Sequence, residues 1–328
     1  MPVLDMPLSD LRNYRGTNPK PADFDQYWDR ALAELADQKD ELELIPAAFT
    51  APGVECFDLY FTGIGGARIH AQLLRPQLLR PEQSTGSQPA LLMFHGYTGD
   101  AGEWSEKLGY AASGFVVAAL DCRGQGGSSQ DSGGVRGNTQ RGHIIRGLDD
   151  APEKLLFRQI FLDTAQLARI VMNMDQVDET RVGAMGGSQG GALTLACAAL
   201  EPRVRKAVSL FPFLCDYQRV WQMDLAERAY AELKEYFRHF DPTHAREQEI
   251  FTRLGYIDIQ HLAHRIRADV LLASGLMDDI CPPSTHFAAY NRIMSAKEIV
   301  IYPDFGHENL PGFPDRAFTF LSTLATGA

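Results

Sequence analysis

Residues 181–200 read RVGAMGGSQGGALTLACAAL, and this stretch places five glycines around Ser188, where an apolar run gives way to a helical pattern. A strand-to-helix turn by itself needs about one glycine. The excess indicates a strained backbone or a close approach by another segment. The segment from Gly186 to Gly190 matches G-x-S-x-G, the turn that exposes a nucleophilic serine at a helix N-terminus. A plain tight turn is the alternative, and the rest of the sequence has to decide between them.

An acid and a histidine follow the serine in the order that such a nucleophile requires. The run VLLASGLMDD (270–279) predicts a strand ending at Asp278, and IVIYPDFGHE (299–308) predicts one followed by a loop with His307. A serine hydroxyl needs a base within hydrogen-bond reach, and that base needs an orienting carboxylate. We therefore expect Ser188 as nucleophile, His307 as base and Asp278, rather than Asp279, as the orienting acid.

Two backbone N–H groups are expected to stabilise the negative oxygen that forms during ester cleavage. One is that of Gln189, directly after the nucleophile. The other lies in the loop after an early strand, here MFHGYTGDAGEW (93–104), where the Tyr97 N–H is the candidate. His95 opens this loop, and we expect it to support the loop rather than to act as a base.

Six short apolar runs, separated by helical or loop sequence, are typical of strands buried on both faces of a parallel sheet. They begin at residues 89, 115, 181, 204, 268 and 297, and the segments 161–174 and 191–200 between them have helical spacing. The predicted class is α/β, a mostly parallel central sheet flanked by helices.

The chain is predicted to form one domain over residues 1–328 with two additions. Residues 1–50 form an N-terminal helical extension whose main helix lies within 18–40, where Asp23 or Asp25 can cap it, and residues 54–76 form a hairpin. Residues 77–89 read as a polar loop. A helical insert at about 213–268 separates the serine from the other two catalytic candidates. We expect this insert to be a cap over the carboxyl ends of the strands, although a helix packed on the flank is the alternative.

Composition narrows the class of function. The chain has 328 residues, a net charge of -11 and five widely spaced cysteines without a CxxC pair. These features favour neutral or cationic small molecules as substrates over nucleic acid or an anionic membrane, and they indicate no metal site. The N-terminal sequence lacks a signal-peptide pattern, and no apolar run reaches the length of a membrane span, so a cytoplasmic location is expected.

Several stretches resemble carbohydrate esterase family 7 of the α/β-hydrolase superfamily, the acetyl xylan esterases and cephalosporin-C deacetylases. The resemblance covers nearly the whole chain, and RGQGGSS together with the His307-Glu308 pair is its most specific part. The stretches are MPLSDLRNYRG (6–16), DFDQYWDRALAE (23–34), RGQGGSS (123–129), GHIIRGLDD (142–150), GGSQGG (186–191), GLMDDICPPSTHFAAYN (275–291) and His307-Glu308.

The resemblance implies the same triad and oxyanion donors as the residues themselves. It also implies an acyl-enzyme mechanism that removes acetyl groups from small acetylated sugars and from cephalosporin C, no cofactor, and a homo-oligomer, a hexamer whose active sites face an internal cavity. Arg123 and Gln125 are expected to hold the loops near the site rather than to contact substrate. A general short-chain carboxylesterase or a peptidase on the same fold is the alternative, whereas the complete triad disfavours a non-catalytic binding protein.

Overall fold

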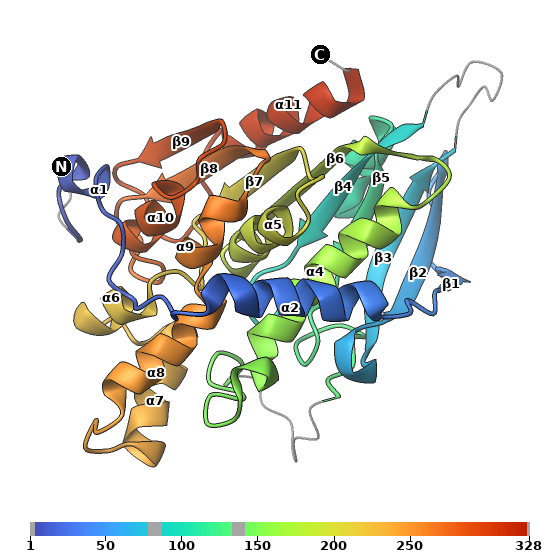
Figure 1. Ribbon diagram of the computed structural model, residues 1–328. Helices are drawn as coiled ribbons and strands as arrows, with labels where there is room; N and C mark the ends of the chain where they lie inside the picture. The colour runs from blue at the N-terminus through green and yellow to red at the C-terminus, as the bar shows by residue number, and fades with distance from the viewer. Residues whose placement is uncertain (1–3, 78–86, 133–141, 327–328) are drawn as a thin grey trace.

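The computed structural model describes residues 4–77, 87–132 and 142–326, and these residues form a nine-stranded sheet (Figure 1). The strand order is β1-β2-β3-β5-β4-β6-β7-β8-β9. The strands are β1 (Glu43–Pro46), β2 (Val54–Thr62), β3 (Arg68–Pro76), β4 (Gln88–Phe94), β5 (Val116–Leu120), β6 (Val177–Gly187), β7 (Lys206–Leu210), β8 (Asp269–Gly275) and β9 (Lys297–Tyr302).

The six strands predicted from apolar runs are β4 to β9, and they pair in parallel throughout. The first three strands are antiparallel to their neighbours, so the sheet is mixed at one side only. Parallel strands bring their carboxyl ends to one edge of the sheet. The loops that follow β4, β6, β8 and β9, which carry the predicted site residues, therefore share that edge.

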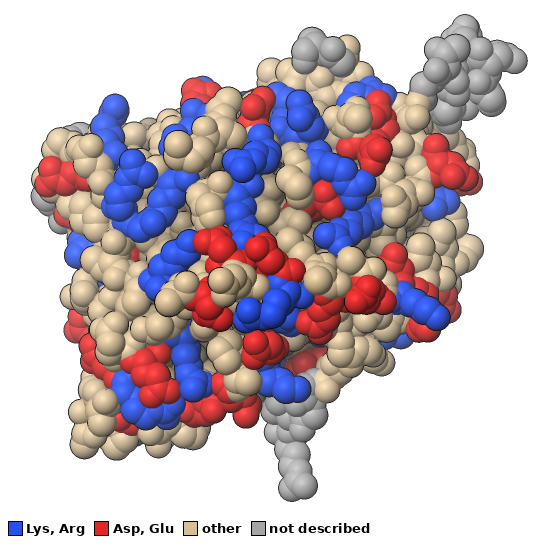
Figure 2. Space-filling view, in the orientation of Figure 1, with Lys and Arg blue, Asp and Glu red and all other residues tan. Residues whose placement is uncertain are grey.

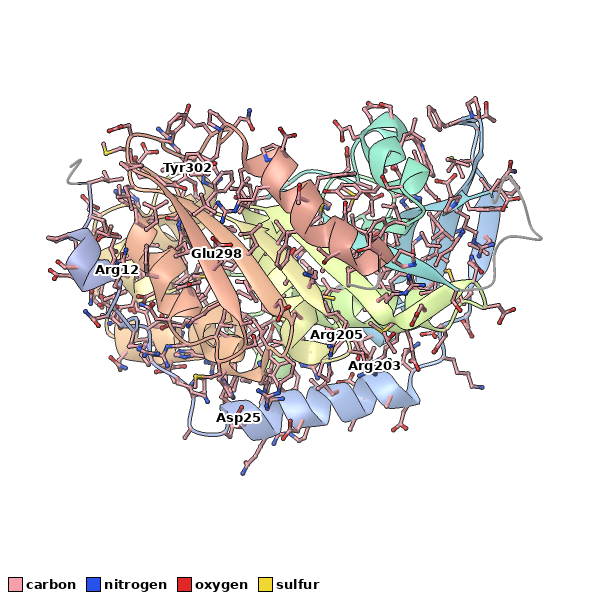
Figure 3. The ribbon with its side chains drawn as sticks, turned by 90° about the horizontal axis from the view of Figure 1, so that it is seen from above. Arg12, Asp25, Arg203, Arg205, Glu298 and Tyr302 are labelled. Atoms are coloured by element: carbon pink, nitrogen blue, oxygen red, sulfur yellow. The ribbon has the colours of Figure 1, made fainter. Side chains whose placement is uncertain are left out.

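The sheet is buried on both faces, as its uninterrupted apolar strands predict. Along β4, Ala90 and Leu92 belong to one core and Leu91 to the other. Helices α2, α4 and α5 pack into the first core and α3 and α11 into the second, so the sheet lies between two helical layers (Figure 3). The helices are α1 (Leu8–Leu11), α2 (Phe24–Asp37), α3 (Leu108–Ala112), α4 (Leu156–Met172), α5 (Gln189–Leu200), α6 (Tyr217–Gln222), α7 (Ala231–Phe240), α8 (Glu247–Leu254), α9 (Ile259–Leu262), α10 (Pro283–Tyr290) and α11 (Phe313–Thr326).

The predicted N-terminal helix is α2, and its apolar stripe is buried at Phe24, Trp28 and Leu35. The expectation for its cap was wrong. Asp23 occupies the N-cap position, but its side chain does not cap the helix. Its carboxylate accepts hydrogen bonds from the Tyr256 hydroxyl at 2.5 Å and from Arg30 at 3.3 Å instead, which ties the start of α2 to a later segment of the chain.

The interval 1–50 is less helical than predicted, because it ends in β1. All four residues of β1 are exposed, and the strand joins the sheet only by antiparallel pairing with the edge of β2. The predicted hairpin is formed by β2 and β3, which pair along their full length around the 3-10 turn η1 (Ile64–Gly66). Most of the predicted polar loop at 77–89 lies outside the described residues.

Between β7 and β8, a stretch that the structure describes in full, the chain forms helices and 3-10 turns joined by loops, with no strand. It forms α6, α7, α8 and α9 together with the short 3-10 turns η5 (Arg228–Tyr230), η6 (Gly255–Ile257) and η7 (Ala263–Arg265). The stretch 221–240 is not one helix: α6 ends at Gln222, and Asp224 and Arg228 adopt positive φ before α7 begins. In Figure 1, α7 and α8 project at the lower left, away from the two layers on the sheet. We refer to α7 and α8 as the cap helices, after the predicted role of the insert, which stays a prediction.

Charged side chains of both signs alternate over the face that α2 covers (Figure 2). The net charge of -11 therefore does not produce a field of one sign on this face. Within the described residues, no helix combines the length and the apolar character needed to cross a bilayer.

Candidate active site

Ser188 sits in the sharp turn between β6 and α5 with a strained backbone, φ 56° and ψ −119°. Positive φ is unfavourable for a residue with a side chain, so the surrounding contacts must hold it. The Ser188 N–H donates to the Leu210 carbonyl at 2.9 Å, and the Ser188 carbonyl accepts from Ala192 and Phe213 at 3.1 and 3.0 Å. These bonds fix the turn to β7 on one side and to α5 on the other.

Three of the five glycines around Ser188, Gly186, Gly190 and Gly191, are required by close packing against backbone atoms. A Cβ on Gly190 would lie 2.0 Å from the Phe94 carbonyl oxygen, and one on Gly186 would lie 2.5 Å from the backbone of Gly190. Gly191 is equally crowded, since its Cβ would lie 2.7 Å from the Leu210 oxygen. The close approach inferred from the sequence does not apply to Gly187, whose Cβ would lie 3.6 Å from its neighbours, an ordinary contact distance.

The structure brings Asp278 and His307 together, with His307 Nδ1 2.8 Å from Asp278 Oδ2. Asp278 is fully buried, and its other oxygen, Oδ1, accepts from the N–H groups of Ile280 and Cys281 at 2.9 and 2.8 Å. Because these bonds use the carboxylate as an acceptor, Nδ1 of His307 carries the proton. Nε2 is then the ring nitrogen with a lone pair available to accept a proton from a nucleophile.

Asp279, the neighbouring carboxylate, lies elsewhere. Its side chain is 45% exposed and pairs with Arg228 at 3.2 Å, at the start of the cap segment. The choice of Asp278 over Asp279, made from the position of each residue after the strand, agrees with this arrangement.

Ser188 reaches the Asp278–His307 pair through two residues that the sequence did not single out. Burial raises the pKa of the Cys281 thiol, and its interaction with the Ser188 side chain opposes this rise. The Cys281 N–H in turn donates to Asp278 Oδ1 at 2.8 Å. The Phe211 ring, next to the Leu210 carbonyl that holds the Ser188 turn, lies 4.2 Å from the His307 ring between centroids. The serine, the acid and the histidine therefore occupy one contiguous cluster at the sheet edge.

A second histidine, His286 on α10, packs behind the acid. It is fully buried, with Nε2 4.0 Å from Asp278 Oδ2 and Nδ1 2.9 Å from the Ser274 hydroxyl. Burial lowers its pKa to about 4, so the ring is neutral near pH 7. His286 thus fills space beside Asp278 without competing with His307 as a charged partner.

The loop that carries Tyr97 is held against the start of α5 by a pair of side-chain amides. Gln125 Nε2 donates to Gln189 Oε1 at 2.8 Å, and Gln189 Nε2 donates back to Gln125 Oε1 at 3.0 Å. Gln125 Oε1 also accepts the Thr98 N–H at 2.9 Å. Gln125 therefore links Thr98, which follows the expected oxyanion donor Tyr97, to Gln189, the other expected donor.

Arg123 is buried and makes a bidentate ion pair with Asp163 of α4, with both N–O distances at 2.6 Å. Its third contact is to the Ile64 carbonyl at 3.0 Å. Gly63 permits this pair, because a Cβ there would lie 2.5 Å from the Arg123 guanidinium. The structure thus places Arg123 in the packing beneath the loop and not toward a substrate.

His95 supports its loop through both ring nitrogens. Nδ1 lies 2.7 Å from the Gly96 carbonyl, and Nε2 accepts the Cys122 N–H at 3.0 Å. Burial lowers the pKa of this imidazole. The strand-end acid Asp121 is likewise structural: it binds His70 at 2.6 Å and accepts N–H groups of Ala101 and Ser128, both at 2.7 Å.

Glu232, on the first turn of α7, was also not identified from the sequence. This carboxyl is 1% exposed, and burial raises its pKa to about 7. It accepts a hydrogen bond from the Tyr97 hydroxyl. A pattern was available: the buried stripe of α7 is Glu232, Leu233, Tyr236 and Phe237, so the glutamate occupies an apolar position.

Within the described residues, no group of three or more His, Cys, Asp or Glu side chains is arranged to hold a metal ion. The five cysteines are all buried as free thiols.

A family model described as acetyl xylan esterase (AXE1) matches residues 1–324. Among curated proteins, the chain is 27% identical over 297 residues to acetyl esterase Axe7A of Xylanibacter ruminicola. That match covers 86% of this chain and 62% of the relative, so the chain spans less than two thirds of the length of that protein.

Two solved structures are similar over almost their whole length. Acetyl xylan esterase 1 from Thermoanaerobacterium sp. JW/SL YS485 is 60% identical with a TM-score of 0.93, covering 98% of this chain and 99% of that one. An acetyl xylan esterase from Paenibacillus sp. R4 is 35% identical with a TM-score of 0.89, covering 97% and 99%. The chain thus has the α/β-hydrolase fold and belongs to the acetyl xylan esterase family, carbohydrate esterase family 7.

Proposed function

We propose that this protein is a serine esterase that removes acetyl groups from small acetylated sugars, xylo-oligosaccharides among them, and from cephalosporin C through an acyl-enzyme. The observation that carries the proposal is the 2.8 Å contact between His307 and the buried Asp278, in one cluster with the strained Ser188 turn. Family membership and the names of the similar proteins support acetyl esters as the substrate class.

In the first half of the reaction, Ser188 Oγ attacks the acetyl carbonyl carbon while its proton moves to His307 Nε2. The carbonyl oxygen becomes an oxyanion, which the N–H groups of Tyr97 and Gln189 bind. The buried Asp278 carboxylate stabilises the imidazolium. The bond from carbon to the sugar oxygen then breaks, and His307 returns its proton to that oxygen, which releases the sugar alcohol and leaves acetyl-Ser188.

In the second half, water replaces the sugar. His307 Nε2 takes one proton from the water as its oxygen attacks the acetyl carbon, and the same two N–H groups bind the second oxyanion. Cleavage of the bond between carbon and Ser188 Oγ returns the proton from His307 to the serine. The products are acetate and the free enzyme, and no redox step or external cofactor enters the balance.

A panel of p-nitrophenyl esters separates this proposal from a general carboxylesterase. We expect the acetate ester to be cleaved with a higher kcat/KM than the butyrate ester, and the octanoate ester to be the poorest of the three. Faster turnover of octanoate than of acetate would overturn the deacetylase assignment. Acetate release from acetylated xylo-oligosaccharides and from cephalosporin C then ranks the candidate substrates.

The Ser188→Ala variant tests whether Ser188 is the nucleophile. We expect kcat to fall by about 10⁴- to 10⁶-fold with little change in unfolding temperature, since the side chain only loses one oxygen. Turnover that survives in this variant would remove Ser188 from the mechanism, whatever the substrate.

A homo-oligomer, specifically a hexamer, and a cytoplasmic location remain proposals that rest on the family resemblance and the composition. Light scattering on the purified protein tests the first, and a clean monomer at working concentration would contradict it.

A further inference from the structure

Helix α7 of the cap inserts a carboxylate into the interior beside the Tyr97 loop. Oε1 of Glu232 accepts from the Tyr97 hydroxyl, and Oε2 accepts from the N–H groups of Ile144 and Ile145 at 2.7 and 3.0 Å. The backbone N–H of Gly142 also lowers the pKa of this carboxylate. Three donors from two separate segments therefore converge on one side chain that is 1% exposed.

The segment 142–145 forms a backbone cradle for this carboxylate. Successive N–H groups around a residue of positive φ make a concave site for an anion, and Gly142 has a φ of 95°. In this chain the anion is a side chain from α7 rather than a ligand. The arrangement gives the stretch GHIIRG (142–147) a physical role that the sequence did not provide.

The same bond network reaches the reacting region. Tyr97 packs its ring against Phe213 and His143, with centroids 5.3 and 5.4 Å away, and the Phe213 N–H binds the Ser188 carbonyl at 3.0 Å. The Gln125–Gln189 amide pair holds the Tyr97 loop on the side of α5. Glu232 holds it on the side of the cap, through the phenol.

We propose that Glu232 is a positioning residue for ester hydrolysis: its carboxylate, seated in the 142–145 cradle, fixes the Tyr97 side chain so that the Tyr97 N–H stays aimed at the oxyanion. This inference rests on the proposed function, because it assumes the oxyanion role of the Tyr97 N–H. It assigns to helix α7 a part in the chemical step.

The requirement is geometric. An oxyanion donor acts only when it lies within about 3 Å of the developing charge, and removing one such donor lowers kcat by about 10²- to 10³-fold. A donor that is present but loosely held loses part of that effect. The substrate ground state has less charge on this oxygen, so the loss is expected in kcat and not in KM.

The test uses the full chain and p-nitrophenyl acetate, with kcat, KM and unfolding temperature measured for each variant. We expect Glu232→Ala to lower kcat by about 10- to 100-fold with KM within about threefold. Glu232→Gln should keep kcat within about threefold, because its amide oxygen can accept from the cradle while its nitrogen donates to the Tyr97 oxygen. Glu235→Gln is the matched control: it removes a charge from an exposed position of the same helix and should leave kcat unchanged.

Tyr97→Phe removes the same bond from its other end and keeps the backbone N–H and the ring packing. It should lower kcat in the same direction, and the Glu232→Ala/Tyr97→Phe double variant should be no slower than Glu232→Ala alone, because both changes break one link. If Glu232→Ala does not fold, the Tyr97→Phe value of kcat decides the question.

A kcat within threefold of wild type in Glu232→Ala or in Tyr97→Phe would overturn the inference, as would losses that multiply in the double variant. The Ser188→Ala variant keeps the two proposals apart. Activity in Ser188→Ala means that the proposed function fails, whereas an inactive Ser188→Ala beside a fully active Glu232→Ala means that only the role of Glu232 fails.

Discussion

The two sides of the candidate site are built differently. On the sheet side, Asp278 and His307 follow the adjacent strands β8 and β9, and Ser188 joins β6 to α5, a helix whose twelve residues are all buried. On the cap side, α7 buries four of its ten residues, and one of these is Glu232. On the sheet side, parallel strands packed in a core position the side chains. On the cap side, the hydrogen bonds of one carboxylate to distant segments position them.

The difference separates two kinds of information. The position of a side chain at the end of a buried strand follows from local sequence, because parallel strands end at the same edge. The bond from Glu232 to Tyr97 spans 135 residues and depends on how the insert folds back. Removing one charge on the sheet side should therefore lower kcat strongly. On the cap side, kcat should depend on how well α7 packs against the Tyr97 loop.

The largest expected effect is on the sheet side. Asp278→Asn replaces the acceptor of the His307 Nδ1 proton with an amide, which favours the wrong imidazole tautomer and no longer stabilises its cation. We expect kcat for p-nitrophenyl acetate to fall by about 10⁴-fold. The unfolding temperature, measured in parallel, reports whether the fold survives the change.

Asp279→Asn is the control at the next position. Its carboxylate is exposed and pairs with Arg228, so kcat should stay within about twofold of wild type. A larger loss in Asp279→Asn than in Asp278→Asn would mean that the acid is assigned to the wrong residue and that the account of the sheet side is wrong.

An intermediate effect is expected on the cap side, in the dependence of stability on pH. Burial raises the pKa of Glu232 from 4.5 to about 7, so between these values the folded protein holds a proton that the unfolded chain has released. Binding of this proton stabilises the folded protein at low pH. The free energy of unfolding therefore falls by about 3 kcal/mol as pH rises from about 4.5 to 7.

Denaturant unfolding of wild type and Glu232→Gln at a series of pH values measures this contribution. The difference in unfolding free energy should change in favour of the Gln variant as pH rises through the window, because the amide has no charge to bury. Parallel curves for the two proteins across that range would show that Glu232 does not titrate in this way.

The smallest effect is expected at Gly187, on the sheet side. A Cβ there meets Leu210 and Phe211 at 3.6 Å, an ordinary contact, so Gly187→Ala should change stability by about 0.5 kcal/mol or less and kcat by less than about threefold. Thermal unfolding and p-nitrophenyl acetate turnover check both values. A loss comparable to that of Gly190→Ala, which drives a Cβ into the Phe94 carbonyl, would show that the turn tolerates less than its spacing indicates.

Sequence reasoning predicted the parts of the fold that local patterns specify. The six parallel strands appear as short apolar runs, and the hairpin of β2 and β3 appears as alternation around a glycine-rich turn. It missed β1, because this edge strand is exposed at every residue, so no buried apolar pattern marks it. It misjudged Asp23, because a distant hydroxyl, that of Tyr256, competes for its carboxylate.

The candidate site divides in the same way. Ser188, Asp278 and His307 could be chosen because each follows a predicted strand and because their order along the chain is restrictive. Glu232 was passed over, since a glutamate near a helix N-terminus is typical of a solvated position, although its place on the apolar stripe of α7 indicates burial. Its burial depends on a cradle of backbone N–H groups some ninety residues earlier, and no local pattern predicts that pairing.

Trapping the acyl-enzyme tests whether Ser188 is the nucleophile that takes up the acetyl group. The protein is mixed with p-nitrophenyl acetate, quenched in acid within the first turnover, and digested for peptide mass spectrometry. We expect one acetyl group on the peptide that contains Ser188, with a higher yield in samples quenched early than in samples quenched after the substrate is consumed. The same peptide of Ser188→Ala should carry none. Full turnover with no acetyl group on Ser188, or an acetyl group that accumulates on another residue at the catalytic rate, would contradict this role of Ser188.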